Sequence, residues 1–278
     1  GGGCGGQKEG GVAMRRCSFF SSVTAMAIFA LLYLPMLSVA VFSVNASKMG
    51  LNWGGFTLSW YASLFHNEFI LRAALNTLIL AAVSTAISTV IGTMLAIGMY
   101  RFPWSRGASR QLNVLLHLPV VTPDIIFAVA LVIAFIVIRY LTGAFELGLA
   151  AMIIGHVTFQ ISFVALAVRG RLELIGHDVE EAACDLYAGY WRVLTKVLLP
   201  MLMPGIMAGA MLAFTLSLDD FVISFFTSGP KSMTLPLYIY AAVRRGITPE
   251  VHALSTIVMI VTIVVVFLAQ KFTPDNKS

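Results

Sequence analysis

Long apolar runs separated by short polar segments constrain the fold of this chain more than any other feature. They lie at about residues 18–43, 70–100, 111–138, 148–168, 201–226 and 251–270. A helix that crosses a bilayer needs about 20 mostly apolar residues. The chain is 59% hydrophobic and 11% charged, whereas a soluble domain has about 25% charged residues. We therefore predict an all-α integral membrane protein with six transmembrane helices.

The N-terminal stretch differs from the rest of the chain. Residues 1–13 (GGGCGGQKEGGVA) are Gly-rich and precede Met14-Arg15-Arg16, which looks like a natural start. We expect residues 1–13 to be a flexible upstream extension or an expression remnant, and residues 14–278 to form one transmembrane domain. The first apolar run exceeds the signal-peptide core of about 7–15 residues, so we interpret it as a retained helix.

The distribution of basic residues predicts the orientation. Six spans put both termini on one side, and 12 of the 18 lysines and arginines fall on that side. The positive-inside rule then places both termini and residues 169–200 in the cytoplasm. These boundary residues explain the net charge of +5, so we expect no nucleic-acid partner. Cys4, Cys17 and Cys184 lack metal-ligand spacing, and we expect no metal site and no cofactor.

Three aspartates lie within the predicted spans, where a charged group is costly and tends to face a cavity. Pro119 and Pro123 interrupt the third run, and broken backbone is tolerated in a membrane where it lines a cavity. Asp124 lies about 13 residues into this run, near the membrane middle, whereas Asp219 and Asp220 lie nearer the outer end of the fifth. Adjacent helical residues point about 100° apart, so one of this pair is expected to face a cation path. Alternatively, these carboxylates cap broken backbone or bond a neighbouring helix.

Other side chains in the spans have two interpretations. Phe221, Tyr238 and Tyr240 can present aromatic faces to ammonium groups, and interfacial anchoring explains them equally well. His156, alone in the fourth run, is predicted to be a hydrogen-bonded packing residue. Small polar side chains in the second run, such as Ser84, predict interhelical hydrogen bonds.

Residues 180–204, EEAACDLYAGYWRVLTKVLLPMLMP, form the longest polar-flecked segment between two apolar runs. The acidic start with two alanines, the Asp-Leu pair and the Leu-Pro pair resemble the EAA loop of bacterial ABC-importer permeases. Further stretches resemble one branch of that family, the inner-membrane permeases of spermidine/putrescine importers, over about residues 15–270. They are NWGGFT at 52–57, TPDI at 122–125, HVTF at 156–159, FTLSLDD at 214–220 and TPEV at 248–251.

This resemblance implies the type I ABC-importer permease fold, with a cytoplasmic loop at about residues 170–200 that docks in a groove on a separate ATPase. It assigns the coupling to Glu180, Glu181, Ala182, Ala183, Asp185, Leu186, Gly189, Leu199 and Pro200. Leu186, Trp191 and Leu194 would pack into the groove. The implied assembly lies in the bacterial inner membrane and imports a polyamine. It contains a second permease as heterodimer partner, two copies of the ABC ATPase and a periplasmic binding protein.

One position departs from the family pattern. Glycine normally follows the Asp-Leu pair of the loop, and here the residue is Tyr187. Glycine tolerates a turn at positive φ that tyrosine resists. We expect Gly189, two residues later, to take over the turn.

The chain lacks a G-x-x-x-x-G-K-[ST] phosphate loop, so we predict a transporter subunit without its own ATPase site, not an enzyme. Related importers for Fe(III), an opine or another small solute are alternatives for the substrate. An intramembrane aspartyl protease using Asp124 with Asp219 or Asp220 would leave the EAA loop unexplained, and no G-x-G-D sequence supports it. A proton-driven transporter would work without any ATPase, so a copurifying ATPase would argue against it.

Overall fold

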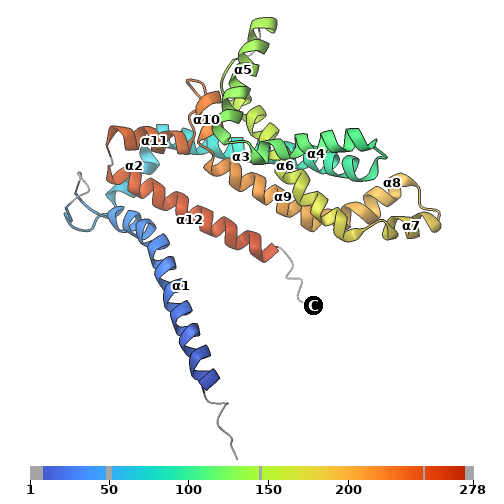
Figure 1. The fold of residues 1–278 in the computed structure, drawn as a ribbon. Helices are drawn as coiled ribbons and strands as arrows, with labels where there is room; N and C mark the ends of the chain where they lie inside the picture. The colour runs from blue at the N-terminus through green and yellow to red at the C-terminus, as the bar shows by residue number, and fades with distance from the viewer. Residues whose placement is uncertain (1–8, 48–51, 144–145, 247, 273–278) are drawn as a thin grey trace, which may run out of the picture. The chain divides into compact units, whose positions relative to one another are not determined.

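The computed structural model describes residues 9–47, 52–143, 146–246 and 248–272 (Figure 1). Within these ranges the regular structure is helical, apart from an isolated bridge between Asn45 and Phe56. The predicted all-α class is therefore confirmed. The chain divides into two units, Gly1–His66 with Ala242–Thr262 and Asn67–Ala241 with Ile263–Ser278.

The first unit contains α1 (Glu9–Phe42), α2 (Ser59–His66) and part of α12 (Pro249–Phe272). Helix α1 begins inside the Gly-rich stretch for which we expected no helix, while residues 1–8 lie outside the described residues. The loop between α1 and α2 is built around the buried Asn45. Its side chain donates to the Asn52 carbonyl at 2.9 Å and accepts from the Gly54 N–H at 2.8 Å, so one amide satisfies two backbone groups of the loop.

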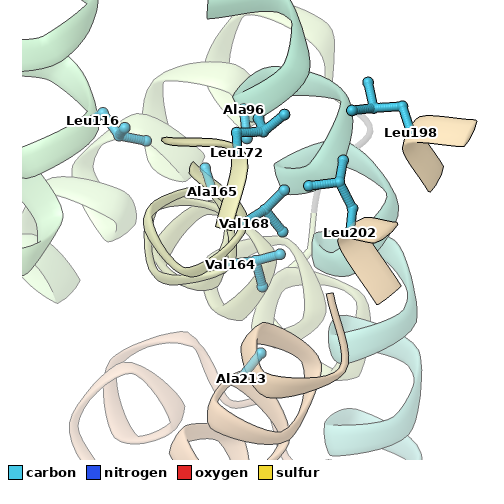
Figure 2. Packing of buried hydrophobic residues seen from close by; sticks show 9 residues of the cluster. All are labelled: Ala96, Leu116, Val164, Ala165, Val168, Leu172, Leu198, Leu202 and Ala213. Carbon is cyan, nitrogen blue, oxygen red and sulfur yellow. The ribbon is translucent and has the colours of Figure 1, made fainter. Parts of the chain in front are cut away.

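The second unit is organised around three long helices that lie side by side, α3 (Glu68–Arg101), α6 (Leu149–Ile175) and α9 (Leu199–Asp219) (Figure 1). Small residues allow this close approach. A Cβ on Gly92 of α3 would lie 2.8 Å from the Val164 Cβ, and one on Gly209 of α9 would lie 3.2 Å from the Val164 Cα. Figure 2 shows the apolar cluster around this contact, which consists of Ala96, Leu116, Val164, Ala165, Val168, Leu172, Leu198, Leu202 and Ala213.

The third predicted span is two helices and not one kinked helix. They are α4 (Arg106–Val121) and α5 (Asp124–Thr142), and the chain between them is extended. Pro119 is accommodated inside α4, whereas Pro123 precedes α5 and disfavours helical backbone at the residue before it. Asp124 is consequently the first residue of a span, and its predicted place in the middle of one is wrong.

The fifth predicted span is also interrupted. Helix α9 ends at Asp219, Asp220 is extended, and the short helix α10 (Val222–Thr227) follows, with α11 (Leu235–Arg245) after it. Aspartate competes for backbone groups through its side chain and therefore favours helix ends over helix interiors. The break places the two adjacent aspartates at the end of α9.

The segment that precedes α9 lies at the opposite end of this bundle from α10 (Figure 1). It contains α7 (Asp178–Asp185), α8 (Tyr190–Arg192) and the π-helix η1 (Val193–Leu198), which continues into α9.

Among the described residues, five helical segments are long and apolar enough to cross a membrane. They are Ser22–Phe42, Glu68–Arg101, Asp124–Thr142, Leu149–Ile175 and Tyr190–Asp219, and the shorter apolar helix Pro249–Val264 matches the sixth predicted run.

Candidate functional site

The break between α9 and α10 is stabilised by the side chain of Asp220. Its Oδ1 accepts from the Ile223 N–H at 3.3 Å, and its Oδ2 accepts from the Ser224 N–H at 2.8 Å. These bonds satisfy two of the backbone donors that a helix leaves unpaired at its N-terminus. Asp220 thus caps broken backbone, which is the alternative that we considered to a carboxylate facing a cation path.

His156 of α6 contacts both sides of this break. Its Nδ1 lies 2.8 Å from the Ser217 Oγ on α9, and its Nε2 lies 3.1 Å from the Ser224 Oγ on α10. The same Nε2 is 3.2 Å from the Asp220 Oδ2. Only 2% of the His156 side chain and 15% of the Asp220 side chain are exposed. The prediction that His156 is a hydrogen-bonded packing residue is confirmed.

The hydrogen bonds continue from this histidine into α3. The hydroxyls of Ser217 and Ser84 are 3.3 Å apart, and further along the bundle Ser88 donates to the Gln160 side chain at 3.1 Å. Gln160 in turn donates to the Ala213 carbonyl at 3.1 Å. Four helices are joined by paired polar groups whose burial without partners would be unfavourable. The interhelical bonds predicted for the second run are confirmed.

Asp219 has a different environment from its neighbour, because it is exposed at the end of α9. Beside the break, the rings of Phe221 and Tyr240 lie 4.5 Å apart between centroids. The structure therefore brings together four of the residues predicted for a substrate path, Asp219, Asp220, Phe221 and Tyr240. Tyr238 lies two residues before Tyr240 on α11, and residues two apart on a helix face different directions.

Asp124 belongs to a different helix, α5, which packs against α10. It is exposed at the start of α5. In the described part of the chain, no hydrogen bond, ion pair or ring contact joins it to Asp219 or Asp220.

The loop between α6 and α9 begins with a sharp turn at Gly176, whose φ of +70° is unfavourable for residues with a side chain. Helix α7 then carries the acidic residues and alanines of the predicted coupling motif. The next turn uses Tyr187 itself at a φ of +59°, while Gly189 has a φ of −66° and is the N-cap residue just before α8. The expectation that Gly189 takes over the turn is wrong. Positive φ is retained at the position where the family pattern has glycine, despite the cost for tyrosine.

The two glutamates of the loop face different surroundings. Glu180 forms an ion pair with Arg101, the last residue of α3, whereas Glu181 is exposed. Several large side chains of the loop are also strongly exposed, namely Leu186 (82%), Tyr187 (97%), Tyr190 (72%) and Trp191 (73%). Leu194, expected in a partner's groove, instead packs against the apolar cluster of its own bundle.

The remaining predicted loop residues occupy the ends of helices. Ala182 is exposed and Ala183 partly buried on α7, and Asp185 ends that helix in an exposed position. Leu199 and Pro200 are exposed in the first turn of α9. Sequence reasoning missed Arg101, which it counted only as a basic residue beside a span. In the sequence Arg101 is an arginine at the end of an apolar run. No motif or spacing connects it with Glu180, which lies far along the chain.

Known proteins match most of the chain. Residues 88–274 match the family described as "Binding-protein-dependent transport system inner membrane component". The spermidine/putrescine transport system permease protein PotC of Escherichia coli K12 is 39% identical over 252 residues, which are 90% of this chain and 92% of that protein. The putrescine transport system permease protein PotI of the same strain is 36% identical over 242 residues, covering 87% and 86% of the two chains.

Solved structures share the fold at low sequence identity. A chain of a bacterial ABC transporter that imports the acidic polysaccharide alginate has a TM-score of 0.74 at 17% identity, covering 95% of this chain and 98% of that one. A chain of the MetNI methionine ABC transporter in an inward-facing conformation has a TM-score of 0.61 at 21% identity, covering 73% and 94%. Both are ABC transporters, in agreement with the predicted fold.

Proposed function

Because the chain belongs to the family of binding-protein-dependent transport system inner membrane components, we propose that it forms half of the transmembrane pore of an ATP-driven polyamine importer. The observation that carries this proposal is the 39% identity to a spermidine/putrescine permease over 90% of the chain. A second permease completes the pore, two ABC ATPase subunits supply the energy, and a periplasmic binding protein delivers the substrate. Both termini lie in the cytoplasm, as the basic residues predict.

The break between α9 and α10 supports a route for the cationic substrate. Helix α9 has 21 residues and is about 32 Å long at 1.5 Å per residue, which is close to the thickness of a bilayer core. If the coupling loop is cytoplasmic, the break lies near the periplasmic side. Asp219, exposed there, receives an ammonium group of the substrate, while the mostly buried Asp220 caps α10 and holds the break in shape.

The aromatic pair beside the break complements this carboxylate. Tyr240 is 38% exposed and packs against Phe221, so an aromatic surface lies next to the exposed charge. An ammonium group over such a ring gains about 0.5–2 kcal/mol. A linear polyamine carries several ammonium groups separated by methylene segments, and both parts of it find complementary surfaces here. Tyr238 and Asp124 would meet the substrate at other points of its path.

The loop between α6 and α9 supports the attachment of the ATPase. Glu181 and the exposed side chains of Leu186, Tyr187, Tyr190 and Trp191 form a surface that a groove on the ATPase would cover. Asp185 adds a second exposed charge on the same segment. ATP-driven closure of the two ATPase subunits would move this loop and switch the pore between inward-facing and outward-facing states.

The test is transport by the reconstituted complex. The permease, its partner permease, the ATPase and the binding protein encoded with it are placed in liposomes, and uptake of labelled spermidine and putrescine is measured. We expect uptake that requires both ATP and the binding protein. Unlabelled Fe(III) and opines serve as competitors and should leave uptake unchanged. An assembled complex that hydrolyses ATP without taking up either polyamine would contradict the substrate assignment.

A further inference from the structure

Arg101 lies where three helices meet at the coupling end of the bundle. It is the last residue of α3, and its guanidinium group contacts the segment that joins α6 to α7. Nη2 donates to the Gly176 carbonyl at 3.4 Å, Nη1 lies 2.6 Å from the His177 Nδ1, and the group forms an ion pair with Glu180. Side-chain exposure is 10% for Arg101 and 22% for Glu180, so the pair is largely shielded from water.

Aromatic contacts reinforce the same junction. The ring of Tyr100, the neighbouring residue on α3, stacks on His177 with centroids 5.1 Å apart and planes 8° apart. The Arg101 guanidinium carbon lies 5.0 Å from the centroid of the Tyr100 ring. Arginine suits this place because its planar group offers several donors in a fixed arrangement and stacks on rings, which the lysine ammonium does not reproduce.

The contacts of Arg101 span the hinge at which the loop leaves the bundle. Gly176 has a positive φ and separates the end of α6 from the start of α7. A rotation of α7 about this hinge would move Glu180, and the ion pair would pull on the end of α3. Helix α3 also shares the hydrogen bond between Ser84 and Ser217 with α9, near the break on the other side of the bundle.

We propose that Arg101 is a positioning residue that transmits movement of the coupling loop to α3 through Glu180, and so links ATP hydrolysis to opening of the pore. This rests on the function proposed above. In this proposal the two glutamates of the motif have different functions. Glu181 contacts the ATPase, whereas Glu180 is bound by Arg101 of its own chain.

The test separates coupling from assembly. Uptake and ATP hydrolysis are measured together in proteoliposomes that contain the full complex, and the ratio of substrate imported to ATP hydrolysed is compared. The variants are Arg101→Glu, Glu180→Arg and the double exchange Arg101→Glu/Glu180→Arg. The matched control is Arg72→Gln, which removes an ion pair with Glu68 at the other end of α3, where both side chains are more than three-quarters exposed (78% and 79%).

We expect each single reversal to lower the ratio about fivefold or more while ATP hydrolysis continues, and the double exchange to recover most of it, because paired groups show strong non-additivity. The control should keep the wild-type ratio. Unchanged ratios in both single variants, or a loss that the double exchange does not reverse, would overturn the role of Arg101. If a reversal prevents assembly, Arg101→Lys and Glu180→Gln carry the test, and both should lower the ratio by a smaller factor.

The wild-type measurement separates this proposal from the one on which it rests. No ATP-dependent uptake by the assembled wild-type complex would overturn the proposed function. Normal uptake by the wild type together with a normal ratio in every Arg101 and Glu180 variant would overturn only the link between the loop and α3.

Discussion

Two pairs of adjacent acids occupy opposite ends of the same bundle, Asp219-Asp220 at the break and Glu180-Glu181 in the coupling loop. In each pair one acid is exposed and the other is held by a basic or histidine side chain from another helix. Asp220 is held by His156 and Glu180 by Arg101. The pattern indicates that one carboxylate of each pair shapes the backbone and leaves its neighbour available to a partner or substrate.

The surroundings of the two pairs differ. At the break, His156, Ser217 and Ser224 form a buried network in which the polar groups pair with one another. In the loop, large apolar side chains are exposed and Tyr187 has an unfavourable φ. The break is therefore completed by its own chain, whereas the loop has the features of a surface that is completed by another subunit.

The largest effect is expected from removing the histidine of the network. His156→Leu removes the histidine contacts of the Asp220 carboxylate and of the Ser217 and Ser224 hydroxyls, and we expect a loss of about 2–3 kcal/mol in stability. The midpoint of thermal unfolding in detergent should fall, and uptake should be lost with it. His156→Asn retains a donor and an acceptor and should recover part of the stability. An unchanged midpoint in His156→Leu would show that the network does not hold the break.

Substitutions of Asp219 and Asp220 should have different effects, the first mainly on transport and the second mainly on stability. Asp219→Asn removes a charge that we assign to the substrate, and uptake should fall about tenfold. That corresponds to 1.4 kcal/mol, between the roughly 1 and 4 kcal/mol for unit charges 4 Å apart in water and near a protein surface. Its unfolding midpoint should match the wild type. Asp220→Asn should lower the midpoint, and equal behaviour of the two variants in both assays would remove the distinction between them.

The sequence predicted the apolar runs well because length and hydropathy decide whether a helix spans a membrane. It did not predict where the fifth run breaks. Asp220 caps α10 through local bonds, but His156, which contacts both sides of the break, lies more than sixty positions earlier in the chain. The ion pair of Arg101 with Glu180 was missed for the same reason. The Tyr187 turn was misjudged because local preference favoured Gly189. In the structure α7 ends with bonds from the Tyr187 N–H to the Cys184 carbonyl and from the Ala188 N–H to the Ala183 carbonyl, and this helix end has its positive φ at Tyr187, two residues earlier.

A smaller effect is expected at Tyr187. Its backbone strain destabilises the loop, whereas its exposed ring is available to bind the ATPase. Tyr187→Gly keeps the left-handed turn but removes its cost, about 1–2 kcal/mol for a residue with a side chain. It also removes an aromatic ring from the exposed surface. We expect the loop to become more stable and the ATPase to bind several-fold more weakly, measured as its dissociation constant from the detergent-solubilised permease pair. Tyr187→Asn tolerates the same φ without the ring and should bind equally weakly. Tighter binding in both variants would place the ring outside the interface.

The smallest effect is expected from the exposed glutamate of the loop. Glu181→Gln removes a charge that we propose to lie at the edge of the ATPase contact surface. An exposed ion pair contributes about 0.2–1 kcal/mol, so the ATPase should bind about two- to fivefold more weakly. Raising the salt concentration should weaken wild-type binding and reduce the difference, because exposed charges are screened. Glu180→Gln is the matched control: since its carboxylate is held by Arg101, it should change the ratio of transport to ATP hydrolysis and leave ATPase affinity as it was. Weaker ATPase binding in Glu180→Gln than in Glu181→Gln would reverse the assignment of the two glutamates.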